Sequence, residues 1–415
     1  MIEAIRNAFK VPDLRRRILF TFGILAIYRF GAHVPVPGVD VSVIRELFKQ
    51  GGILGFMDLF AGGALSEFAV FALGIMPYIT AAIIMELLTV VIPKVEEWAK
   101  EGEIGRRKIT QWTRYLTLFL CLVQSIGLTF FFQGQLKIVF PLFTKFLIVI
   151  TLTTGAIIIM WLGELITQKG IGNGMSLLIF ISIISRFPQA SIETFQIVNP
   201  LLIILLVFII LAMIAAIIFT ESGQRRIPVQ YAKRIVGRRI YGGQSTYIPL
   251  KINSAGVIPI IFAASVLLFP ATLARFFPGK FFKVLAETLN PTSPFYLSLF
   301  ALFIIFFTYF YTAIIFNPID ISDNIKKYGG FIPGVRPGKP TASYLDRILS
   351  RITFPGSLFL ALIAVLPTIF MAQLNIPFFK EFGGISILII VGVALETVRQ
   401  VETHLIMRHY EGFLK

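Results

Sequence analysis

Long apolar runs recur along the whole chain and restrict its fold more than any other feature. A helix needs about 20 mostly apolar residues to cross a bilayer core. Mean hydropathy is +0.82, and only 14% of residues are charged, against about 25% in soluble domains. This pattern predicts an all-α polytopic membrane protein and excludes an ordinary soluble enzyme. Ten transmembrane helices are expected at 18–32, 70–92, 115–132, 146–163, 175–187, 201–219, 254–272, 296–316, 353–371 and 384–401.

Lysine and arginine are distributed unevenly between the loops that join these spans. If the N-terminus is cytoplasmic, 28 of the 38 Lys and Arg residues fall on the cytoplasmic side and 9 on the outer side. Cytoplasmic loops of membrane proteins carry such an excess of basic residues. Both termini are therefore expected in the cytoplasm, with an even number of spans between them.

Two of the expected cytoplasmic loops are longer and more basic than topology requires. Loop 221–252 contains alternating Val, Tyr and Ile with arginines, and it predicts a β-hairpin that turns at Gly242–Gly243. Loop 317–352 contains the run GGFIPGVRPGKPT, which is rich in turn-forming residues. Together they predict a basic protruding surface for an acidic or RNA-containing partner. The alternative is that both are ordinary solvated loops on the positively charged side.

The positions of the long loops also bear on domain organisation. A long outer segment, 33–69, follows the first span, and a long inner segment, 221–252, follows the sixth. This placement favours two five-helix halves of inverted topology, a plan common among transport proteins. The other loop lengths do not match between the halves.

Groups that carry chemistry are scarce. One cysteine, Cys121, and three separated histidines, His33, His404 and His409, exclude a disulfide framework and make a metal centre unexpected. The chain has no zinc-protease, serine-hydrolase or nucleotide-binding motif, so we expect no enzyme activity, no metal and no cofactor. An ion-coupled solute transporter keeps charged groups near the midplane. The only clear intramembrane acid here is Glu86, which is expected about two turns from Pro93 and near the cytoplasmic interface. A purely structural scaffold would not need the two basic loops.

Segment 51–69 is only half apolar and is too short to span the membrane. It contains five glycines, at 51, 52, 55, 62 and 63, around the short helical stretch 56–60. It is either a loop on the outer surface or a short helix that folds back into the membrane. Non-helical backbone at membrane depth is tolerated only where protein buries it or where it lines a cavity.

Several long motifs resemble the SecY family, the channel-forming subunits of the bacterial Sec protein translocon. They are GGALSEFAVFALGIMPYITAAIIMELLTVV (62–91), GEIGRRKITQWTRY (102–115), QKGIGNGMSLLIF (168–180), QRRIPVQYAKR (224–234), YIPLKINSAGVIPIIFA (247–263) and FIPGVRPGKPT (331–341). The resemblance runs from about Phe9 to Tyr410. It implies a protein-conducting channel in two halves, 1–195 and 196–415. Such a channel passes unfolded preproteins across the plasma membrane and releases apolar helices sideways into lipid.

The resemblance also implies the parts that seal such a channel. Segment 55–66 matches the family's plug, with Gly55, Phe56, Met57, Leu59, Phe60, Gly62 and Gly63. The constriction of the family is a ring of aliphatic side chains. Its matching positions are Ile75, Ile79, Ile179, Ile183, Ile261 and Ile389. Branched apolar side chains offer no hydrogen-bond partner to water or ions, so a narrow ring can exclude both by dewetting.

The family's lateral gate lies between spans 2 and 3 on one side and spans 7 and 8 on the other. Thr80 and Phe269 match positions that face each other across it, and Gln124 and Asn253 are expected polar partners there. The alternative for these two amides is ordinary bonding between helices. A hydrogen bond of this kind contributes about 1 kcal/mol or less, so an arriving signal sequence can replace it.

The same resemblance implies binding partners for the two basic loops. These are the SecA motor ATPase and the translating ribosome, including its RNA, and SecE and SecG are expected companion subunits. The residues expected to contact SecA or the ribosome are Arg225, Arg226, Lys233, Arg234, Arg238, Arg239 and Arg336. Arginine offers a planar, bidentate contact to phosphate or carboxylate. Signal sequences, preproteins and membrane lipids complete the expected partners.

Overall fold

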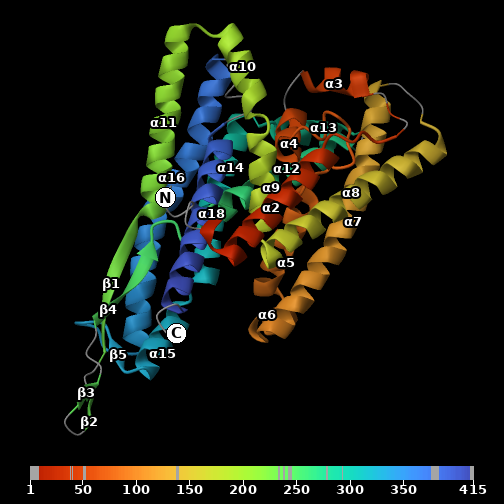
Figure 1. Ribbon diagram of the computed structural model, residues 1–415. Helices are drawn as coiled ribbons and strands as arrows, with labels where there is room; N and C mark the ends of the chain where they lie inside the picture. The colour runs from red at the N-terminus through yellow and green to blue at the C-terminus, as the bar shows by residue number, and fades with distance from the viewer. Residues whose placement is uncertain are drawn as a thin grey trace.

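The protein is almost entirely helical in its computed structural model (Figure 1). The structure describes residues 9–37, 39, 41–49, 53–136, 140–231, 234–236, 239–241, 245–276, 279–291, 293–374 and 383–411. A helix overlaps each of the ten expected spans. These helices are α2 (Pro12–Gly31), α5 (Met76–Val91), α7 (Glu103–Leu136), α8 (Leu142–Lys169), α9 (Gly174–Ile184), α11 (Pro200–Ser222), α12 (Ile258–Phe276), α14 (Pro294–Ile315), α16 (Lys339–Leu374) and α18 (Gly384–Glu411).

Judged by length and hydropathy alone, fewer than ten of these helices qualify as membrane spans. Seven described helical segments are long and apolar enough, and an eighth qualifies if α5 is joined to α6 (Pro93–Lys100) across a bend of 100°. The apolar helix Ile258–Ala274 is shorter, and α2 carries four arginines. The expected count of ten is consistent with this architecture, although the criterion does not reproduce the number.

Several helices begin at a residue pair that fixes the start of the first turn. In α11 the side chain of Asn199 accepts a hydrogen bond from the backbone N–H of Leu201 (3.2 Å), and Pro200 follows it. In α14 Ser293 accepts from the N–H of Tyr296 (3.1 Å), and Pro294 follows. The capping side chain satisfies a free N–H group, and proline needs no partner at this position. The short sequence signals Asn-Pro and Ser-Pro therefore position two of the long apolar helices.

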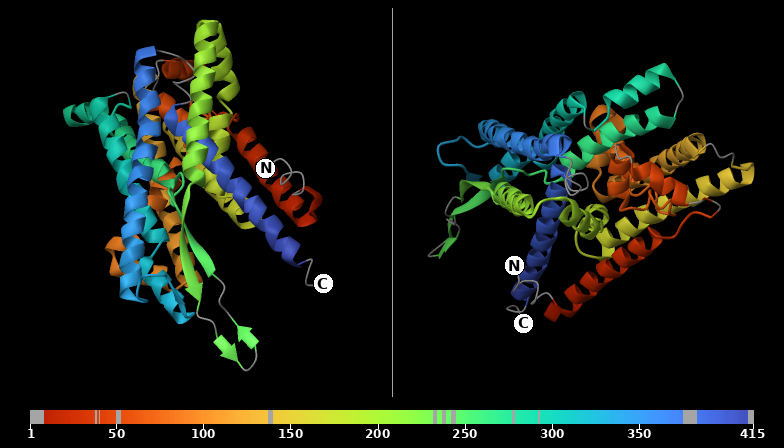
Figure 2. Two further views of the ribbon diagram at one scale, coloured as in Figure 1. Left: turned by 90° about the vertical axis from the view of Figure 1, so that its left-hand side faces the viewer. Right: turned by 90° about the horizontal axis from the view of Figure 1, so that it is seen from above.

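The helices pack in two sets of neighbours. In the first set, α7 packs against α5 and α8, and α8 packs against α2 and α9. In the second, α14 lies between α12 and α16, while α18 contacts α16 and α11. The sets meet where α12 contacts α5 and α7 and where α18 contacts α9. Figure 2 shows the bundle that these helices form from two further sides. One large hydrophobic core draws residues from both sets.

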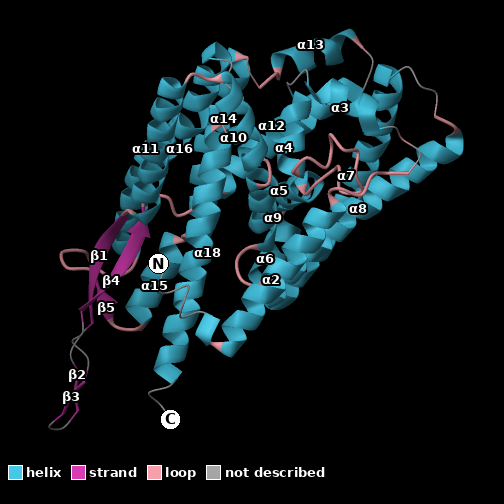
Figure 3. Ribbon diagram, turned by 45° about the horizontal axis from the view of Figure 1, so that its top comes forward, coloured by secondary structure: helices cyan, strands magenta, loops and turns pink. Residues whose placement is uncertain are grey.

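Short elements lie at the two ends of this bundle (Figures 1 and 3). At one end are α3 (Val41–Lys49), α10 (Phe187–Ile197) and α13 (Lys280–Thr288), with α4 (Ile53–Ala61) set deeper among the long helices. At the other end are α6, α15 (Pro318–Lys327) and the β-strands.

The β-strands form the hairpin expected in loop 221–252. β1 (Gln224–Tyr231) pairs antiparallel with β4 (Ser245–Lys251), and beyond them β2 (Arg234–Val236) pairs with β3 (Arg239–Tyr241). The expected turn at Gly242–Gly243 is wrong. Val236 pairs with Arg239, so the chain reverses between these residues, and 242–244 separates β3 from β4 and lies outside the described residues.

A third strand joins the two basic loops into one unit. β5 (Gly330–Phe331) pairs antiparallel with the end of β1, which gives the sheet order β4-β1-β5. A separate apolar cluster packs this sheet against α15 and α16, with Ile227, Val229, Leu250, Ile325, Ile332, Leu345, Ile348 and Leu349 buried. The expected protruding surface is therefore a folded subdomain supported by the long helix α16 and not two independent loops.

Candidate functional site

The six isoleucines expected at the constriction are all buried. Ile75 immediately precedes α5, and Ile79 lies in its first turn, with its N–H bonded to the Ile75 carbonyl (3.2 Å). The other four come from α9, α12 and α18, at Ile179, Ile183, Ile261 and Ile389. Each is at most 5% exposed, and all belong to the main apolar core. The helices that carry them come from both packing sets. Their arrangement as a closed ring stays a prediction.

Segment 55–66 is enclosed by protein. It forms most of α4 and the turn that follows, and α4 contacts α3, α9 and α12. Leu59 and Phe60 are 3% and 1% exposed, while the side chain of Phe56 lies outside the described residues. The surface-loop alternative is therefore wrong, and the segment is a short helix packed among the long ones.

Two glycines let the chain turn back after α4. Gly62 and Gly63 have φ values of +67° and +88°, in the left-handed region that glycine adopts without strain. A Cβ atom on Gly62 would lie 2.9 Å from the Cα of Ser182 in α9. Gly62 therefore serves two purposes, since it supplies the turn and permits close contact with α9.

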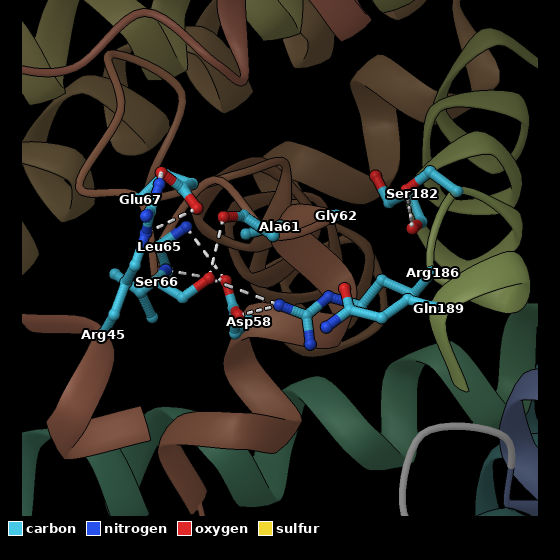
Figure 4. A network of polar contacts seen from close by, with 12 residues as sticks. Arg45, Asp58, Ala61, Gly62, Leu65, Ser66, Glu67, Ser182, Arg186 and Gln189 are labelled. Atoms are coloured by element: carbon cyan, nitrogen blue, oxygen red, sulfur yellow. Dashed lines mark hydrogen bonds and ion pairs between the residues drawn. The ribbon is translucent and has the colours of Figure 1, made fainter. Parts of the chain in front are cut away.

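A polar network surrounds this turn (Figure 4). The carboxylate of Asp58 accepts hydrogen bonds from the N–H groups of Leu65 (3.0 Å) and Ser66 (2.9 Å) and forms an ion pair with Arg186. Arg186 also donates to the hydroxyl of Ser66 (3.3 Å). From α2, Arg29 donates to the carbonyl of Gly62 (2.6 Å). The sequence reasoning missed this network.

The signal that could have identified the network is a single acid in an apolar stretch. Asp58 stands in GFMDLFAGG, and a buried carboxylate requires a cation or several donors. Arg186 and Arg29 stand in sequence near the ends of expected spans, and nothing in their local sequence marks them as partners of Asp58. No spacing rule connects residues that are 128 positions apart in sequence.

Three of the four residues expected at the lateral gate line one pocket. Thr80 of α5, Gln124 of α7 and Phe269 of α12 all border it. The rest of its lining is Met57, Leu65, Ala72, Leu73, Met76, Ser265, Leu268 and Thr272. The pocket therefore lies where α4, α5 and α7 meet α12, and it combines hydroxyl and amide groups with apolar walls. Ser265 and Thr272 were missed, although their spacing from Phe269 places all three on one helix face.

Asn253 is the exception, because the structure places it outside this pocket. It precedes α12, is 2% exposed, and donates hydrogen bonds to the Glu221 carboxylate (2.6 Å) and the Gly256 carbonyl (2.8 Å). Arg399 of α18 donates to the Glu221 carbonyl (2.8 Å). Asn253 therefore joins the end of α11 to the start of α12. The seventh helix begins at Ile258, later than expected, and for this reason Asn253 does not lie on it.

The basic loop residues are only partly described. Arg225 and Arg226 are exposed on β1, where the Arg226 guanidinium lies 4.8 Å from the centre of the Tyr247 ring. Arg336 is exposed after β5, and its carbonyl accepts a hydrogen bond from the Thr341 hydroxyl (2.8 Å). Lys233 and Arg238 lie outside the described residues, and only the strand backbone is described at Arg234 and Arg239.

These features define a class of protein. A bundle of long apolar helices, with a short helix buried among them, is a multi-pass membrane protein. Among the described residues, no three His, Cys, Asp or Glu side chains gather where they could hold a metal ion.

Comparison with known proteins identifies the family. The SecY family model matches residues 69–398. The chain is 51% identical to the protein translocase subunit SecY of Streptomyces scabiei and 45% identical to that of Aquifex aeolicus, and both alignments cover all of each chain. The chain therefore belongs to the SecY family, whose members are channel subunits and not enzymes.

Solved structures share the fold at much lower identity. A structure described as a protein conducting channel has a TM-score of 0.63 at 18% identity, with 94% of this chain and 92% of that chain covered. A SecY structure whose description says that the plug domain stabilises the closed state gives 0.64 at 19%, with the same coverage. Sec61 in the canine ribosome-channel complex gives 0.60 at 16%, also with 94% and 92% covered.

Proposed function

We propose that this chain forms the protein-conducting channel of a bacterial Sec translocase. It passes unfolded preproteins across the plasma membrane and releases transmembrane segments sideways into lipid. The observation that carries the proposal is the burial of α4 among long helices of both packing sets, in the apolar core that also buries the six isoleucines. Membership of the SecY family supports the same function.

The isoleucines act as a seal around the passing chain. Ile75, Ile79, Ile179, Ile183, Ile261 and Ile389 form a ring that offers no hydrogen bond to water or ions, so a narrow opening dewets. Apolar side chains pack by shape and area and not by direction. The same ring therefore yields to polypeptides of different sequence. The plug segment, 55–66, closes the channel on the outer side when no substrate is present.

The pocket between α5, α7 and α12 is the closed lateral gate. Its walls are mostly apolar and can admit a signal sequence, while the hydroxyls of Thr80, Ser265 and Thr272 each bond a carbonyl of their own helix. Gln124 adds an amide to the lining. Interhelical hydrogen bonds in membranes contribute about 1 kcal/mol or less each. An apolar helix of 20 residues gains far more from contact with lipid, so it leaves through this opening.

Packing and charge support the proposed domain division and orientation. Residues 1–195 and 196–415 form two halves, and α12 and α18 make the contacts between them described above. Both termini lie in the cytoplasm, as the excess of Lys and Arg on that side requires. The β-strands and α15 then project into the cytoplasm at the end of the bundle where they gather (Figure 1).

The cytoplasmic subdomain is the docking surface for partners. Arg225, Arg226 and Arg336, together with Lys233, Arg234, Arg238 and Arg239, contact the ribosome during insertion and SecA during secretion. Arginine side chains held on a sheet suit the phosphates of ribosomal RNA. Related channels have been solved with ribosomes, including Sec61 in the canine complex and the idle yeast Ssh1 complex. SecE and SecG are companion subunits, and the largely exposed apolar helix α11 offers an extensive surface to lipid or to such a subunit.

Electrophysiology of the purified complex in a planar bilayer tests the channel and the plug together. We compare the wild type with a deletion of residues 57–65. The deletion should convert a silent protein into an intermittently conducting pore, because the constriction loses its cover. If both proteins stay silent under conditions that open an authentic translocon, the plug assignment is wrong and a small-solute substrate should be sought instead.

A further inference from the structure

Asp58 is a charged residue in the plug segment, and a plug that only fills the pore would not need a buried charge. It is 1% exposed, yet it lies on the one short helix that must move for the channel to open. Two backbone N–H groups and the guanidinium of Arg186 surround its carboxylate. A charge buried without such partners costs several kcal/mol. Asp58 therefore remains in place only while Arg186 stays beside it.

Arg186 joins the plug segment to a helix that carries the constriction. It stands between α9 and α10, three residues after Ile183, and its side chain is 19% exposed. At this depth solvent and salt screen an ion pair less than at the surface. The pair therefore couples the position of α4 to that of the ring residues on α9.

Two further contacts hold the end of α4 from the other side. The Tyr28 hydroxyl of α2 donates to the Ala61 carbonyl at the end of α4 (3.4 Å) and lies 2.6 Å from the Ser182 hydroxyl of α9. Arg29 donates to the Gly62 carbonyl (2.6 Å). We define the plug clamp as Asp58, Arg186, Tyr28, Ser182 and Arg29. All of its contacts join the segment to α2 and α9, or join α2 to α9 beneath it.

The contact between the plug segment and α12 is different in kind. Met57 and Leu65 of the plug segment and Leu268 and Phe269 of α12 line the same pocket, and these side chains are apolar. Opening the gate moves α12 away from α5 and α7, which separates these apolar surfaces. It leaves the plug clamp intact, because the clamp ties the segment to α2 and to the end of α9, two helices of the first packing set.

We propose that the Asp58–Arg186 ion pair fixes the plug segment to the N-terminal half, so that the plug leaves in a step separate from the opening of the lateral gate. Asp58 and Arg186 are positioning residues that set how long the plug remains in place. This inference rests on the proposed function of segment 55–66 as a plug. It adds a charge-dependent step, which a substrate must drive after α12 has moved.

The test measures idle ion conductance of the purified complex for Arg186→Gln, Arg186→Lys, Asp58→Asn and the double variant D58N/R186Q. Arg186→Gln leaves a buried carboxylate unpaired, so the open probability should rise about tenfold or more. Arg186→Lys keeps the charge and should stay near wild type. Asp58→Asn keeps a side-chain oxygen that accepts hydrogen bonds from Leu65 and Ser66, so this variant measures the effect of removing the negative charge alone. The double variant should leak less than Arg186→Gln, because neither partner is left charged.

Arg45→Gln is the matched control. Arg45 also pairs with an acid next to the plug, Glu67, but its side chain is 57% exposed. Hydrogen bonding to Glu67 and its negative charge raise the pKa of Arg45, although an exposed pair contributes little to stability. We expect conductance within about twofold of wild type. Thermal unfolding in detergent identifies any variant that fails to fold, and Asp58→Asn then replaces Arg186→Gln.

A second readout separates the clamp from general loosening of the bundle. Sideways release of a marginally apolar test segment should stay at the wild-type level in Arg186→Gln, because the α12 contacts are untouched. If release rises in step with conductance, the two steps are not separate. If Arg186→Lys leaks as much as Arg186→Gln, the role of the plug clamp is contradicted. The same holds if Arg186→Gln and Asp58→Asn both stay non-conducting while the 57–65 deletion conducts, and in that case the plug assignment is retained. A silent deletion variant contradicts the plug itself.

Discussion

Two buried polar networks in this molecule use the same chemistry for different purposes. Around Asp58, a carboxylate takes its partners from a glycine-containing turn and from Arg186. Around Glu221, a carboxylate takes its partner from Asn253 (2.6 Å), and Arg399 binds the backbone of the same residue (2.8 Å). The first network holds a short segment, whereas the second joins the ends of long helices.

This difference determines what each network controls. Loss of the first frees nine helical residues and a turn and leaves the long helices packed. The second joins α11, α12 and α18, which belong to the scaffold itself, so its loss should lower the stability of the whole bundle. A buried polar contact therefore controls movement where its partner lies on a short element and controls stability where both partners lie on long ones. The predictions below test this distinction.

The largest stability effect is expected for Asn253→Ala. The Glu221 carboxylate is 7% exposed and would lose its side-chain donor, which costs about 1–3 kcal/mol of unfolding free energy. Thermal or denaturant unfolding in detergent measures this loss. Idle conductance should stay at the wild-type level. A leaky but stable Asn253→Ala variant would show that the two networks do not differ in the way described.

A smaller but more specific effect is expected for Gly62→Ala. The new Cβ would meet the Cα of Ser182 at 2.9 Å in a left-handed backbone conformation, which costs roughly 1 kcal/mol or more. The end of α4 should move away from α9, and idle conductance should rise severalfold with little change in unfolding temperature.

Gly55→Ala provides the control within the same segment. A Cβ on Gly55 meets nothing within 4 Å, and Gly55 lies inside α4, where alanine is the better helix former. The idle channel should stay non-conducting, as in the wild type. If Gly55→Ala leaks as much as Gly62→Ala, then any change in the segment opens the channel and the contact with α9 has no special role.

Removing an amide from the gate should have a modest effect. Gln124→Leu replaces a pocket-lining amide that is 8% exposed with an apolar side chain of similar size. Interhelical polar contacts average about 0.6 kcal/mol, so release of a marginal transmembrane segment should shift about threefold or less. Ser298→Ala, on the exposed face of α14, is the control. A shift of the same size there would remove the evidence for a gate.

The smallest effect is expected at the cytoplasmic sheet. Arg226→Ala removes one guanidinium that rests on Tyr247. If it contacts a phosphate of ribosomal RNA, the dependence of log affinity on log salt should fall by roughly one unit. Quantitative binding of ribosomes at several salt concentrations measures this slope. An unchanged slope would place the contact elsewhere on the basic surface.

The parts of the fold that could be predicted are those governed by local composition. Apolar runs located the long helices, and alternating Val, Tyr and Ile located the hairpin, because both patterns report burial over neighbouring residues. The prediction of a turn at Gly242–Gly243 was wrong, because glycine allows a chain reversal but does not require one. The pairing of Val236 with Arg239 places the reversal between those two residues instead.

The parts of the site that could not be predicted depend on contacts distant in sequence. Thr80, Gln124 and Phe269 were located through the family resemblance, and the structure brings them to one pocket. Asp58 and Arg186 were not identified as partners, because only the packing of α4 against α9 brings them together. Asn253 was assigned to a helix that begins five residues later. Its amide therefore meets Glu221 and does not line the pocket.

The central claim is that the short helix α4 must move before the channel can open. An ideal Cβ on Gly74 lies 3.5 Å from the Cβ of Ala61, a separation that suits a disulfide. The double variant Ala61→Cys with Gly74→Cys should therefore lock the end of α4 beside the start of α5. A cysteine at Gly74 is itself strained, because φ there is +57°, so the reduced double variant is the reference for transport. We predict that preprotein transport through the oxidised double variant stops and that a reductant restores it, while each single variant is unaffected by oxidant. Transport at the same rate in the oxidised and reduced forms would contradict the account.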